Sequence, residues 1–198
     1  MSRNIFTNKA VGGLAAAIAG IAIAIGAGHQ APAAAAPVSA GTVQQVAAEA
    51  PATQSPQPVA GLDETQMNNA KKIVETAKGM GMGEKAQIIA LSTAMQESNL
   101  HNLASTKLPE SYKYTDEGEG SDHDSVGLFQ QRQNWGKTKD LMTPETSTRK
   151  FLEALKDVPN WEKLPVTVAA QKVQVSAYPD AYAKHESRAT EIVHELNK

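Results

Sequence analysis

The sequence contains no cysteine among its 198 residues, and only 5% of its residues are aromatic. The absence of cysteine excludes a disulfide scaffold, a thiol nucleophile, a cysteine-bound metal and a lipid anchor attached through cysteine. Charges are balanced, with 19 Lys and Arg against 21 Asp and Glu, and no basic stripe is present, which argues against a nucleic-acid partner. A folded domain in this chain must therefore be stabilised by packing alone.

Several common catalytic and ligand-binding motifs are also missing. The chain has no GxSxG nucleophile elbow, no glycine-rich phosphate loop, no GxGxxG fingerprint and no HExxH zinc motif. Residues 122–124 (Asp-His-Asp) match the start of a calcium-binding loop, but Val126 and Gln133 occupy two positions where the EF-hand template requires oxygen ligands. We therefore predict no metal site and no cofactor. A cation that orders this acidic loop is the alternative.

Composition predicts that the chain begins with a segment for export. Arg3 and Lys9 precede an apolar run rich in Ala, Gly and Ile, and small residues with A-x-A-like sites follow it. This layout is typical of a secretory signal peptide. We predict a signal peptide over residues 1–40, cleaved after Ala40, a secreted or cell-wall location, and no stable membrane span after processing. Retention of the run as a transmembrane anchor is the alternative, since its length approaches the roughly 20 residues that a bilayer requires.

The remaining residues divide into a linker and one domain. Residues 41–61 contain three prolines, many small residues and no aromatic side chain. They can bury too little apolar surface to offset the conformational entropy lost on folding, so we predict a flexible linker. Residues 62–198 are predicted to form a mostly α domain, which we expect to be a monomer. Asp63 and Gln66 predict the start of a helix over 62–78. A later helix is expected to begin at Pro179, and residues 173–175 allow a short strand.

One predicted helix, over residues 84–97, is apolar on nearly all sides and ends at Glu97. Such a helix normally lies inside a domain, so a carboxyl group at its end becomes crowded by other elements. Burial and the partial negative charge of the helix C-terminus both favour the neutral form of this group. A carboxylic acid that stays protonated near neutral pH can act as a general acid. The alternative is a glutamate that simply extends into solvent.

A long loop with a dense acidic patch at residues 116–124 follows this helix.

Four stretches of the domain resemble a known family. They are QESNLHNL, DSVGLFQQRQNWG, TRKFLEAL and VAAQKVQVSAYPDAYAKH. Glu97-Ser98 at a helix end, followed after a loop by S-x-G-L-F-Q, is similar to the soluble lytic transglycosylases and goose-type lysozymes of the lysozyme-like superfamily. The four stretches together resemble the secreted, actinobacterial-type branch of these peptidoglycan-cleaving domains. The resemblance implies a lysozyme-like helical fold over residues 62–198, with peptidoglycan glycan strands as the partner.

The resemblance also implies roles for individual residues. Glu97 matches the catalytic general acid, and Ser125, Gly127 and Gln130 match the cleft motif, in which glycine permits close backbone approach and an amide can bind sugar groups. The family's third motif, Ala-Tyr followed by Asn-Ala-Gly, is present only as its Ala-Tyr pair at residues 177–178. Tyr178 is expected either to hydrogen-bond the Glu97 carboxyl or to be buried and bonded elsewhere.

Two tryptophans offer flat faces on which a sugar ring can stack. Trp135 follows the cleft motif, and both sugar binding and core packing remain open for it. Trp161 is expected in the core.

Three functions follow as expectations. A lytic transglycosylase needs only one glutamate, because the substrate supplies the other groups. Its acetamido group takes part in the cleavage step, and its 6-hydroxyl closes a 1,6-anhydro ring. A hydrolytic lysozyme usually needs a second carboxylate, and Asp122 and Asp124 are the clustered candidates. The third possibility is a cell-wall-binding module that retains the fold and cleft without turnover. We expect the transglycosylase, which cuts the β-1,4 bond between N-acetylmuramic acid and N-acetylglucosamine.

Overall fold

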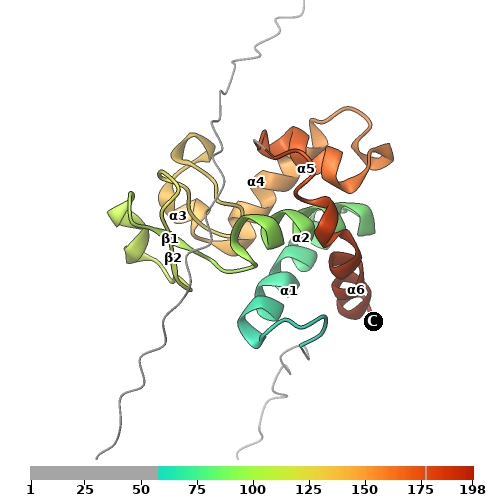
Figure 1. Cartoon of the computed structure of the whole chain (residues 1–198), viewed down its shortest axis with the longest axis horizontal. Coiled ribbons are helices and arrows are strands. Elements are labelled where there is room, and N and C mark those ends of the chain that lie inside the picture. The colour runs from blue at the N-terminus through green and yellow to red at the C-terminus, as the bar shows by residue number, and fades with distance from the viewer. Residues whose placement is uncertain (1–57, 177) are drawn as a thin grey trace, which may run out of the picture. The chain divides into compact units, whose positions relative to one another are not determined.

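The structure is a computed structural model that describes residues 58–198 except 177 (Figure 1). The predicted signal peptide and residues 41–57 of the predicted linker lie outside the described residues. The elements follow one another as α1 (Glu64–Gly79), α2 (Glu84–Ser98), β1 (Ala104–Ser105), η1 (Pro109–Lys113), β2 (Glu119–Gly120), η2 (Gln133–Trp135), α3 (Thr138–Leu141), α4 (Pro144–Lys156), η3 (Trp161–Lys163), α5 (Val166–Gln174), η4 (Ala183–His185) and α6 (Glu186–Leu196). The prediction of a mostly α fold is confirmed.

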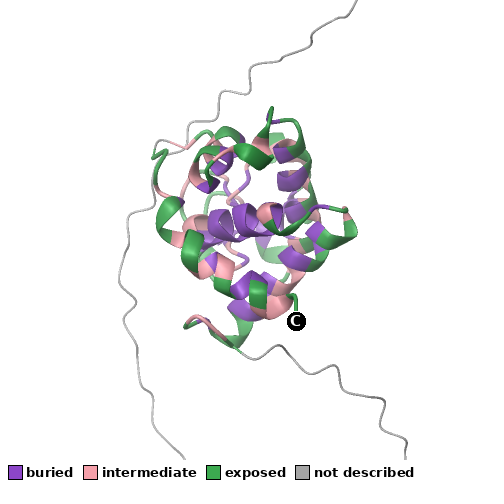
Figure 2. Cartoon of the chain, turned by 90° about the vertical axis from the view of Figure 1, so that its right-hand side faces the viewer, coloured by how far each residue is buried: buried purple, intermediate pink, exposed green. Residues whose placement is uncertain are grey.

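Helix α2 forms the centre of the described structure. It packs against α1, α4, α5 and α6, and every residue at positions 86–95 is buried (Figure 2). The helix can be covered on all sides because alanines, isoleucines, a leucine and a methionine occupy most of its surface. A helix enclosed in this way is held rigidly by its neighbours, so its last turn, which carries Glu97, has a fixed position.

Helix α1 begins where the sequence predicts and holds the chain that leaves α2. Asp63 and Gln66 form a reciprocal capping box, which satisfies backbone donors at the helix start. The Gln66 amide also donates to the Asn99 carbonyl at 2.9 Å, and the Asn69 amide donates to the Leu100 carbonyl at 2.9 Å. Both carbonyls belong to left-handed residues that end α2. Two buried amides of α1 therefore fix the turn that follows the last residues of α2.

The long loop after α2 contains short ordered elements. Strands β1 and β2 pair in parallel, and η1 lies between them. A small apolar cluster lies beside this part of the chain and is formed by Ala104, Val126, Leu141 and Met142. The carboxylate of Glu117 accepts hydrogen bonds from the Asn69 amide at 2.6 Å and from the Asn102 backbone at 2.7 Å. The acidic loop is thereby attached to α1 and to the chain after α2.

In the C-terminal part, a strand that the sequence allowed is not formed, and the predicted start of the last helix is wrong. Residues 173–175 form no strand, because α5 continues to Gln174 and Val175 caps it in the left-handed conformation, with φ of 53°. The last helix begins at Glu186 rather than at Pro179, because a turn and the short helix η4 precede it. The pattern of apolar residues in this segment fits a continuous helix, but the turn instead directs Tyr182 into the core, where it is fully buried.

The segment of residues 126–131 reverses the chain sharply. Val126 and Gln131 exchange two backbone hydrogen bonds of 3.0 Å, and Gly127 has a φ of +76°. A β-carbon placed on Gly127 would lie 2.2 Å from the carbonyl oxygen of Leu141. Only glycine fits this position, because both the backbone conformation and the space exclude a side chain.

Gly127→Ala is expected to destabilise the domain by roughly 2–4 kcal/mol, because the added methyl group meets a backbone atom and the residue must keep a positive φ. Chemical denaturation of both variants measures this change. Gly79→Ala is the matched control, since its β-carbon would meet nothing within 4 Å. Equal stability of Gly127→Ala and the wild type would contradict the assigned geometry.

Candidate active site

The carboxyl group of Glu97 lies at the C-terminal end of α2 and is largely enclosed. The Tyr182 hydroxyl donates a hydrogen bond of 2.8 Å to its Oε1 atom. Burial raises the pKa of Glu97 above its usual value, and this effect outweighs the opposing hydrogen bonds from Tyr182 and Gln174. The negative charge of Asp122 adds to the increase in pKa. The surroundings of the Glu97 carboxyl therefore shift its equilibrium towards the protonated form, and the bond from Tyr182 fixes its orientation.

Two contacts join the end of α2 to the segment of residues 126–131. The Ser98 hydroxyl donates to the Leu128 carbonyl at 2.8 Å, and the Gln174 amide donates to the Phe129 carbonyl at 2.9 Å. The Phe129 ring is fully buried and stacks on Phe151, with ring centroids 4.8 Å apart. The structure thus brings Glu97 and the predicted cleft motif together, and Gln174 contacts both.

The polar residues of the predicted cleft motif have distinct surroundings. Ser125 is buried, and its backbone N–H donates to the Asp122 carbonyl at 3.1 Å. Gln130 is partly exposed, and its amide nitrogen donates to the Gly127 carbonyl at 3.0 Å. Its amide oxygen faces Gly120 of β2, where a β-carbon would lie 3.1 Å away. Gln130 therefore lies between the glycine turn and the loop that contains the acidic patch.

The hydrogen bond expected from Tyr178 is made by Tyr182. Tyr178 is 56% exposed, so the alternative prediction that it is buried is also wrong. The sequence contains the alanine-tyrosine pair twice, at residues 177–178 and 181–182, and only the second tyrosine is directed into the core. This repeat was the available signal for Tyr182. Gln174 carried no comparable signal, because one glutamine on a helix has many possible positions.

Both tryptophans are partly buried. Trp135 is partly buried and packs against both apolar clusters of the domain. Its contacts on two sides favour core packing over a free sugar-stacking face. Trp161 packs against the main core, as predicted, and a part of its ring remains accessible.

The two candidate second carboxylates differ in their partners. Asp124 forms an ion pair with Arg132 and accepts a second hydrogen bond from the Gln133 backbone at 3.4 Å. Burial acts to raise the pKa of Asp124, but the bonds from Arg132 and the backbone outweigh it and lower the pKa. Asp122 instead contacts the His123 ring at 2.7 Å, and its charge acts on Glu97. Asp122 is therefore the acidic residue of the loop that is coupled to the site.

A histidine contacts the residue that precedes Glu97 in the sequence. The Nε2 atom of His185 is 3.1 Å from the side-chain oxygen of Gln96. Burial, with smaller contributions from the nearby charges of Lys184 and Arg188, lowers the pKa of His185 to about 4. His185 is thus uncharged at neutral pH and contributes no positive charge that would favour the ionised form of Glu97.

Among the described residues, no group of three or more His, Asp or Glu side chains is arranged to hold a metal ion. No helix in the described part of the chain is long and apolar enough to span a membrane. Neither the models of known protein families nor the curated protein sequences gave a match to this chain. The site must therefore be interpreted from its own geometry and from the motifs of the sequence.

Tyr182→Phe is expected to raise the pKa of Glu97 further. The Tyr182 hydroxyl stabilises the ionised carboxylate, so its loss leaves burial less opposed. A ¹³C NMR titration of the Glu97 carboxyl carbon measures this change. Tyr178→Phe is the matched control and should leave the titration unchanged, because Tyr178 is exposed. A lower or equal Glu97 pKa in Tyr182→Phe would contradict the role assigned to the hydroxyl.

Proposed function

We propose that this protein cleaves the glycan strands of peptidoglycan as a lytic transglycosylase, with Glu97 as the general acid and base. One observation carries the proposal: a carboxyl group with a raised pKa is fixed by Tyr182 beside the Ser125–Gln131 motif. The residues of this arrangement belong to the Glu-Ser and S-x-G-L-F-Q motifs, which occur in the sequence in the order that the resemblance implies. The lysozyme-like fold, the secreted location and the peptidoglycan substrate are parts of this proposal.

The chemistry follows from the protonation state of Glu97. The protonated carboxyl gives its proton to the glycosidic oxygen as the bond to the N-acetylmuramic acid carbon breaks. The acetamido oxygen of the same sugar stabilises the positive charge that develops on this carbon. The 6-hydroxyl of the sugar then attacks the carbon and gives its proton to the Glu97 carboxylate. The products are a strand that ends in a 1,6-anhydro ring and a new glycan end, and Glu97 is again protonated.

The surrounding residues have separate tasks in this proposal. Tyr182 holds the carboxyl in place while it changes its charge, because its hydroxyl remains a donor throughout. Gln174 couples the carboxyl to the Phe129 backbone and so keeps the motif at a fixed position. Gln130 is partly exposed and offers an amide to hydroxyl and acetamido groups of the sugar. Tyr178 and Trp135 remain proposed substrate contacts of lesser weight, since Tyr178 is exposed and Trp135 packs against both apolar clusters.

Glu97→Gln is expected to reduce the release of soluble muropeptides from purified peptidoglycan at least 100-fold, because the amide cannot donate or accept the catalytic proton. Mass spectrometry of the products identifies the reaction, since a 1,6-anhydro end is lighter by one water than a reducing end. Glu191→Gln, on the exposed face of α6, is the control. Equal peptidoglycan binding without release by either protein would support a wall-binding module instead.

A hydrolytic muramidase is the second candidate. The effect of Asp122 on Glu97 favours Asp122 over Asp124 as its second carboxylate. Asp122 acts on the Glu97 carboxyl through its charge, whereas both oxygens of Asp124 are engaged by Arg132 and Gln133. In this candidate the Asp122 carboxylate would activate a water molecule or stabilise the cation. The products would then carry reducing ends.

Asp122→Asn distinguishes the two reactions. Asp122 raises the pKa of Glu97, so its neutralisation lowers that pKa and moves the alkaline limb of the pH–rate profile to lower pH. For the transglycosylase we expect this shift, together with a maximal rate within about tenfold of the wild type. A loss of rate of about 100-fold or more in Asp122→Asn at every pH, together with reducing ends in the products of the wild type, would instead establish the hydrolase.

A further inference from the structure

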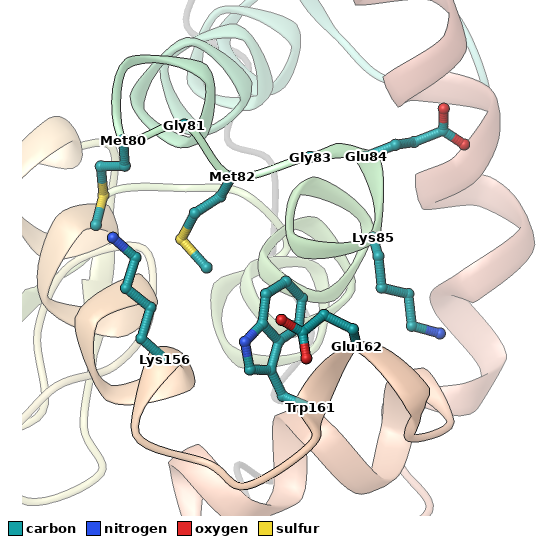
Figure 3. Close-up of a pocket in the computed structure, with 9 residues that line it drawn as sticks. All are labelled: Met80, Gly81, Met82, Gly83, Glu84, Lys85, Lys156, Trp161 and Glu162. Carbon is teal, nitrogen blue, oxygen red and sulfur yellow. The ribbon is translucent and has the colours of Figure 1, made fainter.

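A pocket lies at the opposite end of α2 from Glu97. Helix α2 spans 15 residues, so its two ends are about 20 Å apart. The pocket has a volume of about 510 Å³ and lies between the turn that joins α1 to α2 and the turn that joins α4 to η3 (Figure 3). This volume is typical of sites for small ligands. None of the residues proposed for peptidoglycan cleavage lines it.

The inner part of the pocket is apolar. Met82 is only 6% exposed, and Met80 and Trp161 are partly buried against the main core. Figure 3 shows the Met82 thioether and the Trp161 ring side by side in the pocket. A flat indole next to flexible thioethers can adapt to a small aliphatic group. The pocket therefore offers an apolar contact that is accessible from outside.

The outer part of the pocket carries charges of both signs. Lys85, Lys156 and Glu162 line it, and none of the three makes a salt bridge within residues 58–198 apart from 177. Glu84 is directed away from the lysines, and its Oε1 atom is 3.2 Å from Nε2 of His194 on α6. Two ammonium groups and one carboxylate thus remain available to a ligand in a protein whose net charge is −2.

We propose that this pocket binds the stem peptide of peptidoglycan. A stem peptide carries carboxylates for Lys85 and Lys156, an amino group for Glu162, and alanine methyl groups for Met82 and Trp161. An uncharged sugar would leave all three charged groups without partners, and a simple inorganic anion would make no use of the apolar part. This inference rests on the proposed function, because it assigns a second contact to the same substrate.

Gly83 provides a variant that separates binding from folding. It is the N-cap of α2, with φ of −75° and no side-chain hydrogen bond to the helix start, and its β-carbon would meet nothing within 4 Å. Aspartate is a favourable N-cap residue, so Gly83→Asp should retain or increase the stability of the domain. The same carboxylate would lie in the pocket and repel a carboxylate ligand.

The test is a titration of the full chain with the synthetic tetrapeptide L-alanyl–D-isoglutamyl–meso-diaminopimelyl–D-alanine, followed by NMR at the two indole N–H signals. We expect the Trp161 signal to shift and the Trp135 signal to stay. Lys85→Gln and Lys156→Gln should each weaken binding roughly five- to tenfold, and Gly83→Asp should weaken it at least tenfold with an unchanged or higher unfolding midpoint. Lys113→Gln, on the exposed surface of η1, is the control and should bind like the wild type.

The outcomes separate this inference from the proposed function. Glu97→Gln should bind the tetrapeptide like the wild type even though its release of muropeptides is reduced at least 100-fold. Glu97-dependent release without a tetrapeptide-induced shift of Trp161 would overturn the second site and leave the enzyme intact. An equal shift caused by inorganic phosphate or by chitotetraose at the same concentration would also overturn the assignment to a peptide. Tetrapeptide binding with no release by any variant would support the pocket and contradict the enzyme.

Discussion

The hydrogen bond between the Tyr182 hydroxyl and the Glu97 carboxyl is the interaction on which the candidate site depends. A carboxyl group that leaves water loses favourable solvation of its charged form, and a single well-placed donor recovers only a part of that loss. The net effect in this protein is a raised pKa of Glu97, since burial outweighs the donors from Tyr182 and Gln174. The same bond fixes the direction of the carboxyl. Protonation and orientation therefore have one structural cause, which is the enclosure of the end of α2.

That enclosure requires several parts of the chain to meet. Buried amides of α1 hold the chain after Glu97, and the Ser98 hydroxyl binds the segment of residues 126–131. Gly127 allows this segment to lie directly against the Leu141 carbonyl. Polar contacts of this kind are needed because a carboxyl group cannot be positioned by apolar packing alone. The apolar helix α2 supplies the rigidity, and the hydrogen bonds supply the exact direction of each group.

The sequence allowed the central helix, its terminal glutamate and the capping box of α1 to be predicted, because these follow from local patterns of apolar and capping residues. It did not identify Tyr182 or Gln174, which reach Glu97 through tertiary packing. The choice between Tyr178 and Tyr182 depends on a turn at residues 179–182, and turns of this kind are not determined by apolar periodicity. Asp122 and Asp124 likewise became distinguishable only when the partner of each carboxylate was known.

The distance along the chain between Glu97 and Tyr182 has a consequence for folding. The two residues are separated by 85 positions, and α2 packs against helices from both the beginning and the end of the domain. Contacts between distant residues form late, because the loss of chain entropy precedes the gain from the contact. A nascent or partly folded chain therefore contains the glutamate but not its environment. The raised pKa and the fixed orientation of Glu97 therefore arise only when the last helices have docked, so both properties indicate that the entire domain has folded.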